Sequence, residues 1–327
     1  MRIGVFLVAA GFPGVGPERS LRTALDYGIA AEDAGFDDVF VAEHHFMRYG
    51  TCPSALTFAA ALAGRTRRIG VGTAVTVLST AHPVAVAEQA AMLDVLTGGR
   101  FTLGVGRGGP WVDLEVFGTG MEGLSHRAFA EALDVLVAWG SQEAVAYDGE
   151  FHRFREVPVV PRGRAPMLVG CTGPDTVRLA AERGLPILLG MHADDAEKAA
   201  MVRAHGGRAG HVSVLLAQVA ESRAAGVGLL RRTMPTWLGP GMAGYVRFDG
   251  AEAAMRDPVA YTDHLTGIHP IGPAAYCADR ILESGRATGV ERFLLFVEAG
   301  GPDHTMANIK ALGSSVLPLL RAGSTAR

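Results

Sequence analysis

The sequence lacks several features that would mark particular classes of protein. Its 327 residues carry three cysteines, a formal net charge of −3, and apolar runs of about five to nine residues. Such runs are far shorter than the roughly 20 apolar residues that span a bilayer. A nearly neutral charge gives no electrostatic case for binding nucleic acid or an anionic membrane. The cysteines (Cys52, Cys171 and Cys277) are widely spaced, which argues against a disulfide framework or a zinc site and favours a reducing, cytoplasmic location.

The motifs of several common enzyme classes are also missing. Neither an HExxH nor a CxxC spacing occurs, and no GxSxG elbow marks a serine hydrolase. The glycine-rich stretch 104–110, GVGRGGP, resembles a dinucleotide-binding loop but lacks an acidic ribose partner at the end of the next strand. We therefore predict no resident metal, no serine nucleophile and no bound NAD.

What the sequence does contain is an alternation of strand-like apolar runs with helical patterns. The eight runs are residues 2–9, 38–43, 69–78, 101–106, 166–171, 186–191, 212–220 and 291–298. The first has the apolar character of a signal peptide, but its length and β-branched residues favour a strand. Near-continuous apolar strands are typical of a parallel sheet covered by helices on both faces. Eight β-then-α units predict an α/β fold, a single (β/α)8 TIM barrel over residues 1–327.

Two stretches depart from this repeat. Residues 144–166 contain an Asp-Gly turn between alternating residues, which predicts a hairpin inserted before the fifth strand. Residues 235–273 are rich in Gly, Pro and aromatic residues, and we interpret them as a long excursion after the seventh strand that could form a lid.

Chemistry-bearing residues stand where barrel strands end. The second strand runs into Glu43, His44 and His45, within VFVAEHHF. Active sites of TIM barrels lie at the carboxyl ends of the strands, so these side chains are expected at the barrel mouth. Adjacent histidines on an extended chain point to opposite faces, which makes them poor joint ligands of a metal.

Anion-binding elements follow the fourth and fifth strands. Arg107 lies among glycines that let a ligand approach the backbone, and a guanidinium suits phosphate. Thr172 and Thr176 flank the start of a helix whose free amides attract anions. Arg127, at the start of the fourth helix, is a third candidate. Together they predict a phosphate-bearing cofactor across the mouth.

Three blocks of sequence resemble a known family. They are VAEHHF, then GVGTAVTVLSTAHPVAVAEQAAMLDVLTGGRF, then GVGRGGPWVDLEVFGTGM, with further likeness at HPIGP and FLLFVEAGG. In order and spacing these blocks resemble the bacterial luciferase-like flavin-dependent monooxygenases, and within them the luciferase α subunit. The resemblance implies a TIM barrel that takes FMN as FMNH2 from a separate reductase, reacts it with O2 to a C4a-hydroperoxide, and transfers one oxygen atom.

The resemblance also implies roles for individual residues. His44 matches the family's catalytic imidazole, His45 follows it, and Asp113 matches an acid near the flavin. Glu43 belongs to the same flavin-site motif, and Ala74-Val75 matches a non-proline cis peptide that supports the flavin ring. The phosphate is expected at Arg107, Arg127, Thr172, Gly173 and Thr176.

Two departures from luciferase bear on the substrate. Gly106 stands where the luciferase α subunit has a reactive cysteine, which we expect to open space above the flavin, and the loop at 245–270 is shorter. Both weigh against fatty-aldehyde oxidation and useful light emission. With the aromatic residues they suggest a roomy apolar pocket for a polycyclic or polyketide-like molecule, with hydroxylation, epoxidation and Baeyer–Villiger insertion all open. The aromatic candidates are Trp111, Trp237, Tyr245 and Tyr261.

The resemblance further implies a homodimer, because the helix at 83–97 presents a stripe of apolar residues with Glu88 among them. The stripe comprises Val84, Ala87, Glu88, Ala91, Met92 and Val95. Two other functions remain open: an F420-dependent oxidoreductase of the same superfamily, which should want more basic residues at the mouth, and a non-catalytic flavin-binding protein.

Overall fold

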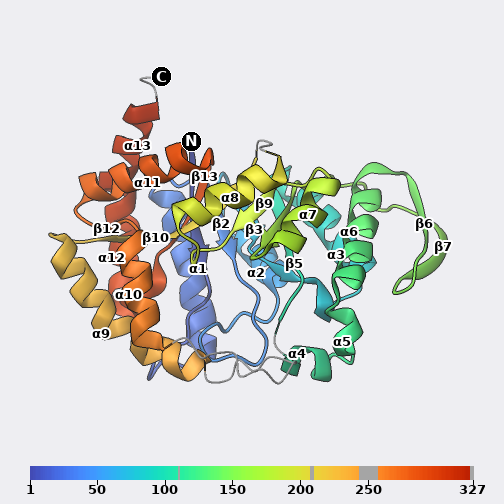
Figure 1. Ribbon diagram of the computed structural model, residues 1–327, viewed down its shortest axis with the longest axis horizontal. Coiled ribbons are helices and arrows are strands. Elements are labelled where there is room, and N and C mark those ends of the chain that lie inside the picture. Colours follow the sequence, from blue (N-terminus) through green and yellow to red (C-terminus); the bar gives the residue numbers. More distant parts are fainter. Residues whose placement is uncertain (110, 207–209, 243–256, 325–327) are drawn as a thin grey trace.

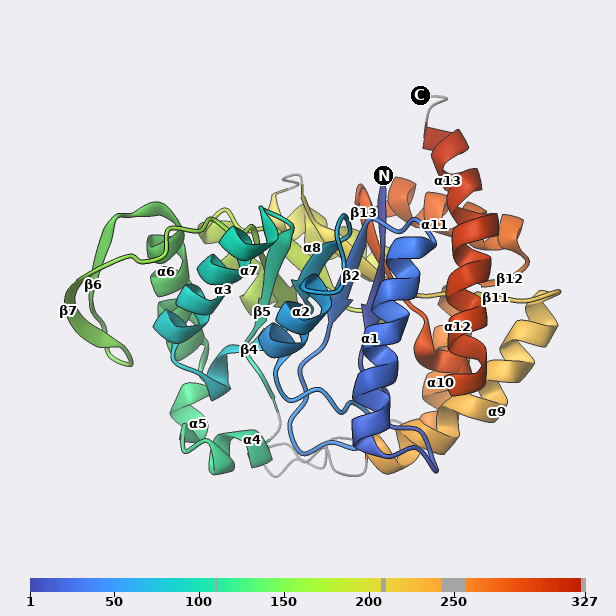
Figure 2. The same cartoon turned by 180° about the vertical axis from the view of Figure 1, so that it is seen from behind.

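The computed structural model describes residues 1–109, 111–206, 210–242 and 257–324. Eight parallel strands stand in the centre with helices around them (Figures 1 and 2). The strands are β1 (Arg2–Leu7), β2 (Asp38–Val41), β3 (Gly70–Thr73), β5 (Phe101–Gly106), β8 (Met167–Cys171), β9 (Ile187–Leu189), β10 (Val212–Leu216) and β13 (Arg292–Phe296). The eight runs predicted from the sequence are thus confirmed as strands.

The sheet closes on itself. Its strand order is β3-β2-β1-β13-β10-β9-β8-β5-β4, where the short β4 (Thr76–Val77) follows β3 in the chain and both of them pair with β5. The first and last strands of the chain lie side by side in register, with Val5 opposite Leu295. This closed parallel sheet confirms the TIM barrel.

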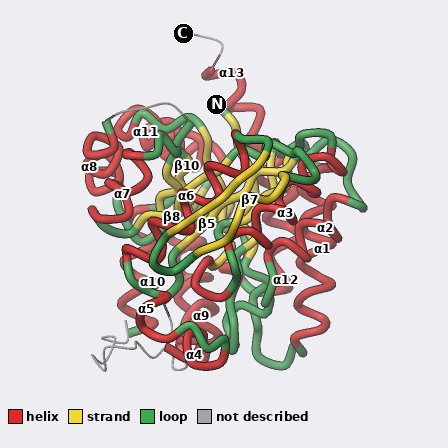
Figure 3. The backbone as a smooth tube through the Cα atoms, turned by 90° about the vertical axis from the view of Figure 1, so that its right-hand side faces the viewer, coloured by secondary structure: helices red, strands yellow, loops and turns green. Residues whose placement is uncertain are grey.

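Helices follow the strands and cover the outside of the barrel (Figure 3). They are α1 (Pro17–Asp33), α2 (Ala55–Ala63), α3 (Pro83–Thr97), α6 (His126–Ser141), α7 (Pro174–Glu182), α8 (Asp195–His205), α9 (Arg223–Met242), α10 (Pro258–Ile268), α11 (Ala274–Thr288), α12 (Pro302–Ala311) and α13 (Leu317–Ser324). Local sequence fixes several of their ends. Ser54 caps α2 by accepting the N–H of Thr57, and Asp194 and Glu197 form a capping box on α8.

Two apolar cores lie on either side of the sheet. The barrel interior holds large side chains, including Phe6, Phe40 and Phe296. A second, larger cluster lies between the strands and the helices and includes Val5 and Leu103. Because successive strand residues alternate between the two cores, most strand positions are apolar, which explains the long apolar runs in the sequence.

The predicted hairpin is confirmed and projects from the barrel beside α6 (Figure 1). It consists of β6 (Ala144–Asp148) and β7 (Arg153–Pro158), paired antiparallel. The carboxylate of Glu131 on α6 holds its turn by accepting the N–H groups of Glu150, Phe151 and His152 at 2.8–3.1 Å.

The expected excursion from Pro235 is mostly helical where it is described. The helix α9 continues through Pro235 and Pro240 to Met242, and α10 follows from Pro258. The long excursion after the seventh strand is thus present, and its described parts are helical. Proline weakens a helix by removing a hydrogen bond, but α9 buries Met234 and Trp237 against the barrel-interior cluster, and this burial outweighs the loss. Residues 243–256 lie outside the described residues.

The two ends of the barrel differ. The amino end holds both chain termini (top of Figure 1), and the opposite end holds the two short helices α4 (Trp111–Val116) and α5 (Gly120–Gly123) together with the end of α9. This second end is where the strands finish, so it is the expected mouth.

Candidate active site at the barrel mouth

A cavity of about 580 Å³ opens at the mouth between three segments. They are the loop after β1, the loop after β2 and the last turns of α9. The walls are mainly apolar, with the imidazole of His44 among them. The lining residues are Gly11, Phe12, Pro13, Val15, Pro17, His44, Phe46, Met47, Arg48, Gly50, Thr51, Pro53, Thr236, Trp237 and Pro240.

His44 is held by its own loop. Its N–H donates to the carbonyl of Cys52 at 2.9 Å, and the ring packs edge-on against Tyr49 with 4.7 Å between centroids. Gly50 lies so close that a Cβ there would collide with Nδ1 of His44. Desolvation in this packing lowers the pKa of His44 to about 4, with a smaller contribution from His45. The imidazole is therefore uncharged at neutral pH, and it can accept a proton.

Glu43 and His45 point away from that cavity. The carboxylate of Glu43 accepts the N–H of Ala55, the first residue of α2, at 2.9 Å and the N–H of Val77 at 3.0 Å. The Nε2 of His45 lies 3.5 Å from Oε1 of Glu43, and the ring is 8% exposed. Glu43 therefore joins two neighbouring strand ends and orients His45, whereas His44 faces the cavity.

Asp113 completes the buried group around His45. It lies on α4 and is 3% exposed, and its Oδ1 has no hydrogen-bond partner within the described residues. Burial raises the pKa of its carboxyl, while the charge of His45 lowers it and that of Glu43 raises it. Phe117 covers His45 edge-on with 4.9 Å between ring centroids. Acid, imidazole and acid are thus brought together beneath an aromatic cover.

The third strand carries the predicted backbone feature. The Ala74–Val75 peptide is cis, which confirms the expectation from the sequence. Val75 also corrects the interpretation of Gly106. A Cβ at Gly106 would stand 2.5 Å from Cγ2 of Val75, so the space that we expected to be open is filled by that valine.

The expected phosphate elements lie at the ends of β5 and β8, which pair directly. The guanidinium of Arg107 donates to the carbonyl of Leu124 at 2.6 Å. Gly173 is the N-cap of α7 and provides no side-chain cap, and Thr176 donates its hydroxyl to the carbonyl of Gly173 at 3.0 Å. Thr172 is exposed beside them. The first-turn amides of α7 are not used by a capping side chain and suit a phosphate.

Arg127 is placed differently from the other phosphate candidates. It forms an ion pair with Glu150 of the hairpin, and its guanidinium lies over the ring of Phe151, 5.8 Å from the centroid. Its side chain is 72% exposed. Nothing in this arrangement brings Arg127 together with Arg107.

Sequence reasoning missed several residues of the cavity wall. Trp237 was expected there, but Phe12, Arg48 and Thr51 were not. Only the fold brings the β1 and β2 loops face to face, and no motif in the sequence marks this contact. Tyr261 instead bonds the ring of His192, with 2.9 Å from its hydroxyl to Nδ1. Tyr245 and the side chain of Trp111 lie outside what the structure describes.

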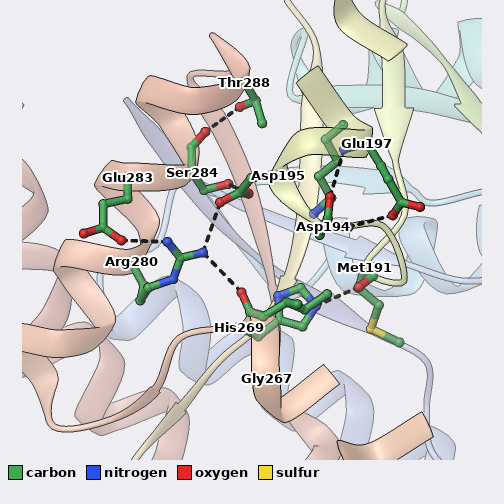
Figure 4. Close-up of polar contacts among 12 residues, drawn as sticks. Met191, Asp194, Asp195, Glu197, Gly267, His269, Arg280, Glu283, Ser284 and Thr288 are labelled. Carbon is green, nitrogen blue, oxygen red and sulfur yellow. Dashed lines mark hydrogen bonds and ion pairs between the residues drawn. The ribbon is translucent and has the colours of Figure 1, made fainter. Parts of the chain in front are cut away.

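A polar network joins α8 to α11 (Figure 4). Arg280 on α11 donates to Asp195 of α8 at 3.0 Å and to Glu283 at 2.6 Å. Ser284 donates to the other oxygen of Asp195 at 2.6 Å, and His269 bonds the carbonyl of Met191 at 2.7 Å. The network ties α8 and the end of β9 to the chain that follows α10.

Two structural features are absent from the described residues. No group of three or more His, Cys, Asp or Glu side chains could hold a metal ion there. In the same part of the chain, no helix is long and apolar enough to cross a membrane.

Comparison with known proteins places this mouth in context. The family model described as luciferase-like monooxygenase matches residues 1–292. The alkanal monooxygenase alpha chain of Photorhabdus laumondii is 30% identical over 98% of both chains. Among solved structures, the FMN-bound oxygenating constituent of 3,6-diketocamphane monooxygenase from Pseudomonas putida superposes with a TM-score of 0.75 at 18% identity, over 97% of this chain and 98% of that one. An F420-dependent secondary alcohol dehydrogenase superposes with a TM-score of 0.77 at 19% identity, over 98% and 99%.

Proposed function

Because the chain belongs to the luciferase-like monooxygenase family, we propose that it uses FMNH2 and O2 to oxygenate an apolar small molecule, of which a polyketide-like compound is one candidate. The observation that carries this proposal is the mainly apolar cavity with the uncharged imidazole of His44 in its wall. We propose that residues 1–327 act as one barrel domain for this purpose.

The residues at the ends of β5 and β8 suit a flavin mononucleotide. The guanidinium of Arg107 would bind the phosphate together with the first-turn amides of α7 after Thr172 and Gly173, and Thr176 steadies that turn. Ala74, Val75 and Gly106 would lie under the flavin ring. Reduced flavin, when bound, supplies the electrons that activate dioxygen.

The side chains around the flavin ring would have different roles. An uncharged His44 accepts a hydrogen bond from the reacting group, because its low pKa keeps the ring unprotonated at neutral pH. His45 and Asp113 lie behind it with Glu43 and keep the loop oriented. Phe12 and Trp237 exclude water from the cavity and provide an apolar surface for the substrate.

FMN is favoured over F420 by the small number of cations expected at the mouth. The tail of F420 is longer than that of FMN and acidic, so its site should be richer in basic residues. Arg107 lies at the end of β5, which pairs with β8, whereas Arg127 is exposed and paired with Glu150 of the hairpin. The barrel fold itself accommodates both cofactors, because solved structures with either one superpose on this chain.

Two partners follow from the proposed chemistry. A separate reductase would supply FMNH2, since the sequence has no NAD-binding motif with its acidic ribose partner. We also propose a homodimer through the outer face of α3, where Met92, Val95 and Leu96 are 48%, 56% and 74% exposed. Ala87 and Ala91 of the predicted stripe are buried within the described chain instead.

Rapid mixing of the protein and FMNH2 with O2 tests the function. We expect a transient near-ultraviolet absorption band, distinct from those of reduced and oxidised FMN, that persists longer than for free FMNH2. Failure to form this band together with tight binding of F420 would overturn the proposal in favour of F420-dependent hydride transfer. Flavin binding with no such band and no turnover of any substrate would indicate a non-catalytic flavin-binding protein.

A further inference from the structure

A carboxylate outside the predicted site is buried beside the cavity wall. Glu298 opens the short 3-10 helix Glu298–Gly300 that follows β13, and it is 1% exposed. Its Oε2 accepts the N–H of Val8 at 2.6 Å, and its Oε1 accepts the N–H of Ala10 at 3.0 Å. A single carboxylate therefore holds two amides just after the end of β1.

The backbone between those amides needs this support. Ala9 has a φ of +50°, in the left-handed region that residues with a Cβ rarely adopt. Such a conformation costs on the order of 1 kcal/mol or more and persists only where its surroundings determine it. The two hydrogen bonds from Glu298 span the strained residue on both sides.

The end of β1 in turn fixes the loop that contains His44. The carbonyl of Ala9 accepts both the N–H of Thr51 at 3.0 Å and its hydroxyl at 2.8 Å. Ala10 forms an antiparallel bridge with Gly50, and the N–H of Gly11 donates to the carbonyl of Tyr49 at 3.2 Å. The two loops therefore form a short ladder along one wall of the cavity.

The same loop residues pack on the imidazole. Tyr49 lies edge-on to His44, and Gly50 lies against Nδ1 without room for a Cβ. The end of α9 supports them from outside, since Gly241 touches Tyr49 just as closely. A shift of the β1 end would move Tyr49 and Gly50 away from the ring and admit water.

We propose that Glu298 is a positioning residue for His44, acting through the end of β1 and the Tyr49–Thr51 backbone. The inference rests on the proposed role of His44 in the reaction. It concerns the surroundings of the imidazole, which can be measured without flavin or substrate.

The charge of Glu298 is governed by its burial. Desolvation raises its pKa to about 7, against the lowering effect of the amides of Ala10 and Val8. The titratable side chain that faces it within the described residues is Tyr27 on α1. The pKa of Tyr27 is raised to about 12 by burial and, to a smaller extent, by Glu298.

The test is the titration of His44 in Glu298→Ala. Because Glu298 has a pKa of about 7, its carboxyl is already protonated at the pH at which His44 titrates, and an amide would mimic that state. Alanine accepts neither N–H, so both hydrogen bonds are lost. The ring titration is followed by 15N-histidine NMR on the flavin-free protein, with the His44 resonance assigned from His44→Asn. We expect the pKa of His44 to rise from about 4 by about one unit or more, a tenfold change in proton affinity.

Glu32→Ala is the matched control. Glu32 also accepts backbone N–H groups, those of Arg67, Arg68 and Ile69, but it does so before β3 at the opposite end of the barrel. We expect a comparable loss of thermal stability and no change in the titration of His44. Glu298→Gln, which keeps the shape and the carbonyl acceptor of the protonated acid, should retain most of the wild-type titration.

An unchanged pKa of His44 in folded Glu298→Ala, or the same rise in Glu32→Ala, would overturn the inference. If Glu298→Ala does not fold, Thr51→Val tests the next link by removing the hydroxyl bond to Ala9, and an unaltered titration there overturns it equally. Absence of flavin chemistry in the wild-type protein would count against the proposed function and leave this result intact.

Discussion

The contact between Gly106 and Val75 allows a quantitative test of how the end of β5 packs against the chain after β3. Gly106→Ala adds one methyl whose carbon would stand 2.5 Å from Cγ2 of Val75, well inside normal contact. Overpacking of this kind costs about 1–3 kcal/mol. Gly106 has no positive φ, so the cost comes from the collision and not from backbone strain. Val75→Ala alone removes two partly buried methyl groups and should cost about 1 kcal/mol.

The double variant should be more stable than the sum of its parts, because the new methyl occupies space left by the valine. We expect a coupling free energy of about 1–2 kcal/mol in a double-mutant cycle, measured from urea unfolding midpoints at constant slope. Thr76→Ser paired with Gly106→Ala serves as a control, because Thr76 neighbours Val75 but is not among the contacts of Gly106. Simple additivity of Gly106→Ala and Val75→Ala would refute the conclusion that Val75 fills this space.

Three further predictions concern charge and ligand binding. Arg107→Gln should weaken FMN binding at least tenfold while leaving riboflavin binding within about twofold, because riboflavin has no phosphate for Arg107 to bind. Flavin fluorescence quenching measures both affinities. Equal weakening of both flavins would show that Arg107 does not bind the phosphate. Folding lowers the pKa of His44 from 6.5 to about 4, so the unfolded chain binds the proton more tightly than the folded protein does. The free energy of unfolding should therefore fall by about 3 kcal/mol in all as the pH falls from 6.5 towards 4. His44→Asn should flatten this part of the curve of stability against pH, and an unchanged curve would contradict the burial of a neutral ring. Asp195→Asn should cost about 1–3 kcal/mol in urea unfolding because Arg280 and Ser284 both donate to that carboxylate, whereas Asp148→Asn on the exposed hairpin should cost less than about 0.5 kcal/mol.

The barrel could be predicted because two sequence features mark each strand. Each run is mostly apolar, since both faces of a strand are buried, and each is followed by a helical pattern. The hairpin was predictable from its Asp-Gly turn. The helical course of α9 was not, because local propensity at Pro235 and Pro240 opposes it and only burial of residues such as Trp237 reveals why it forms.

Site residues were predictable where they follow the end of a barrel strand, because that position places them at the barrel mouth. Glu43, His44 and His45 follow β2 directly, so their presence at the mouth follows from the barrel alone. The space at Gly106 was misjudged because an absent side chain says nothing about what a neighbouring strand contributes, here Val75. Glu298 was missed for a related reason: its partners are backbone amides 288 and 290 residues away in sequence, and amides leave no mark in a sequence pattern.

His44 and His45 have different surroundings because their side chains point in opposite directions. His44 faces the cavity in a packed, uncharged state, with Nδ1 free of a hydrogen-bond partner among the described residues. His45 lies behind it, 3.5 Å from Glu43 and near Asp113. Exchanging their roles would require the loop to slip by one residue. That slip would break the bonds of Glu43 to Ala55 and Val77, the bridge of Ala10 to Gly50, and the packing of Tyr49. The backbone contacts around this loop therefore select which imidazole faces the cavity, and the other lies beside Glu43.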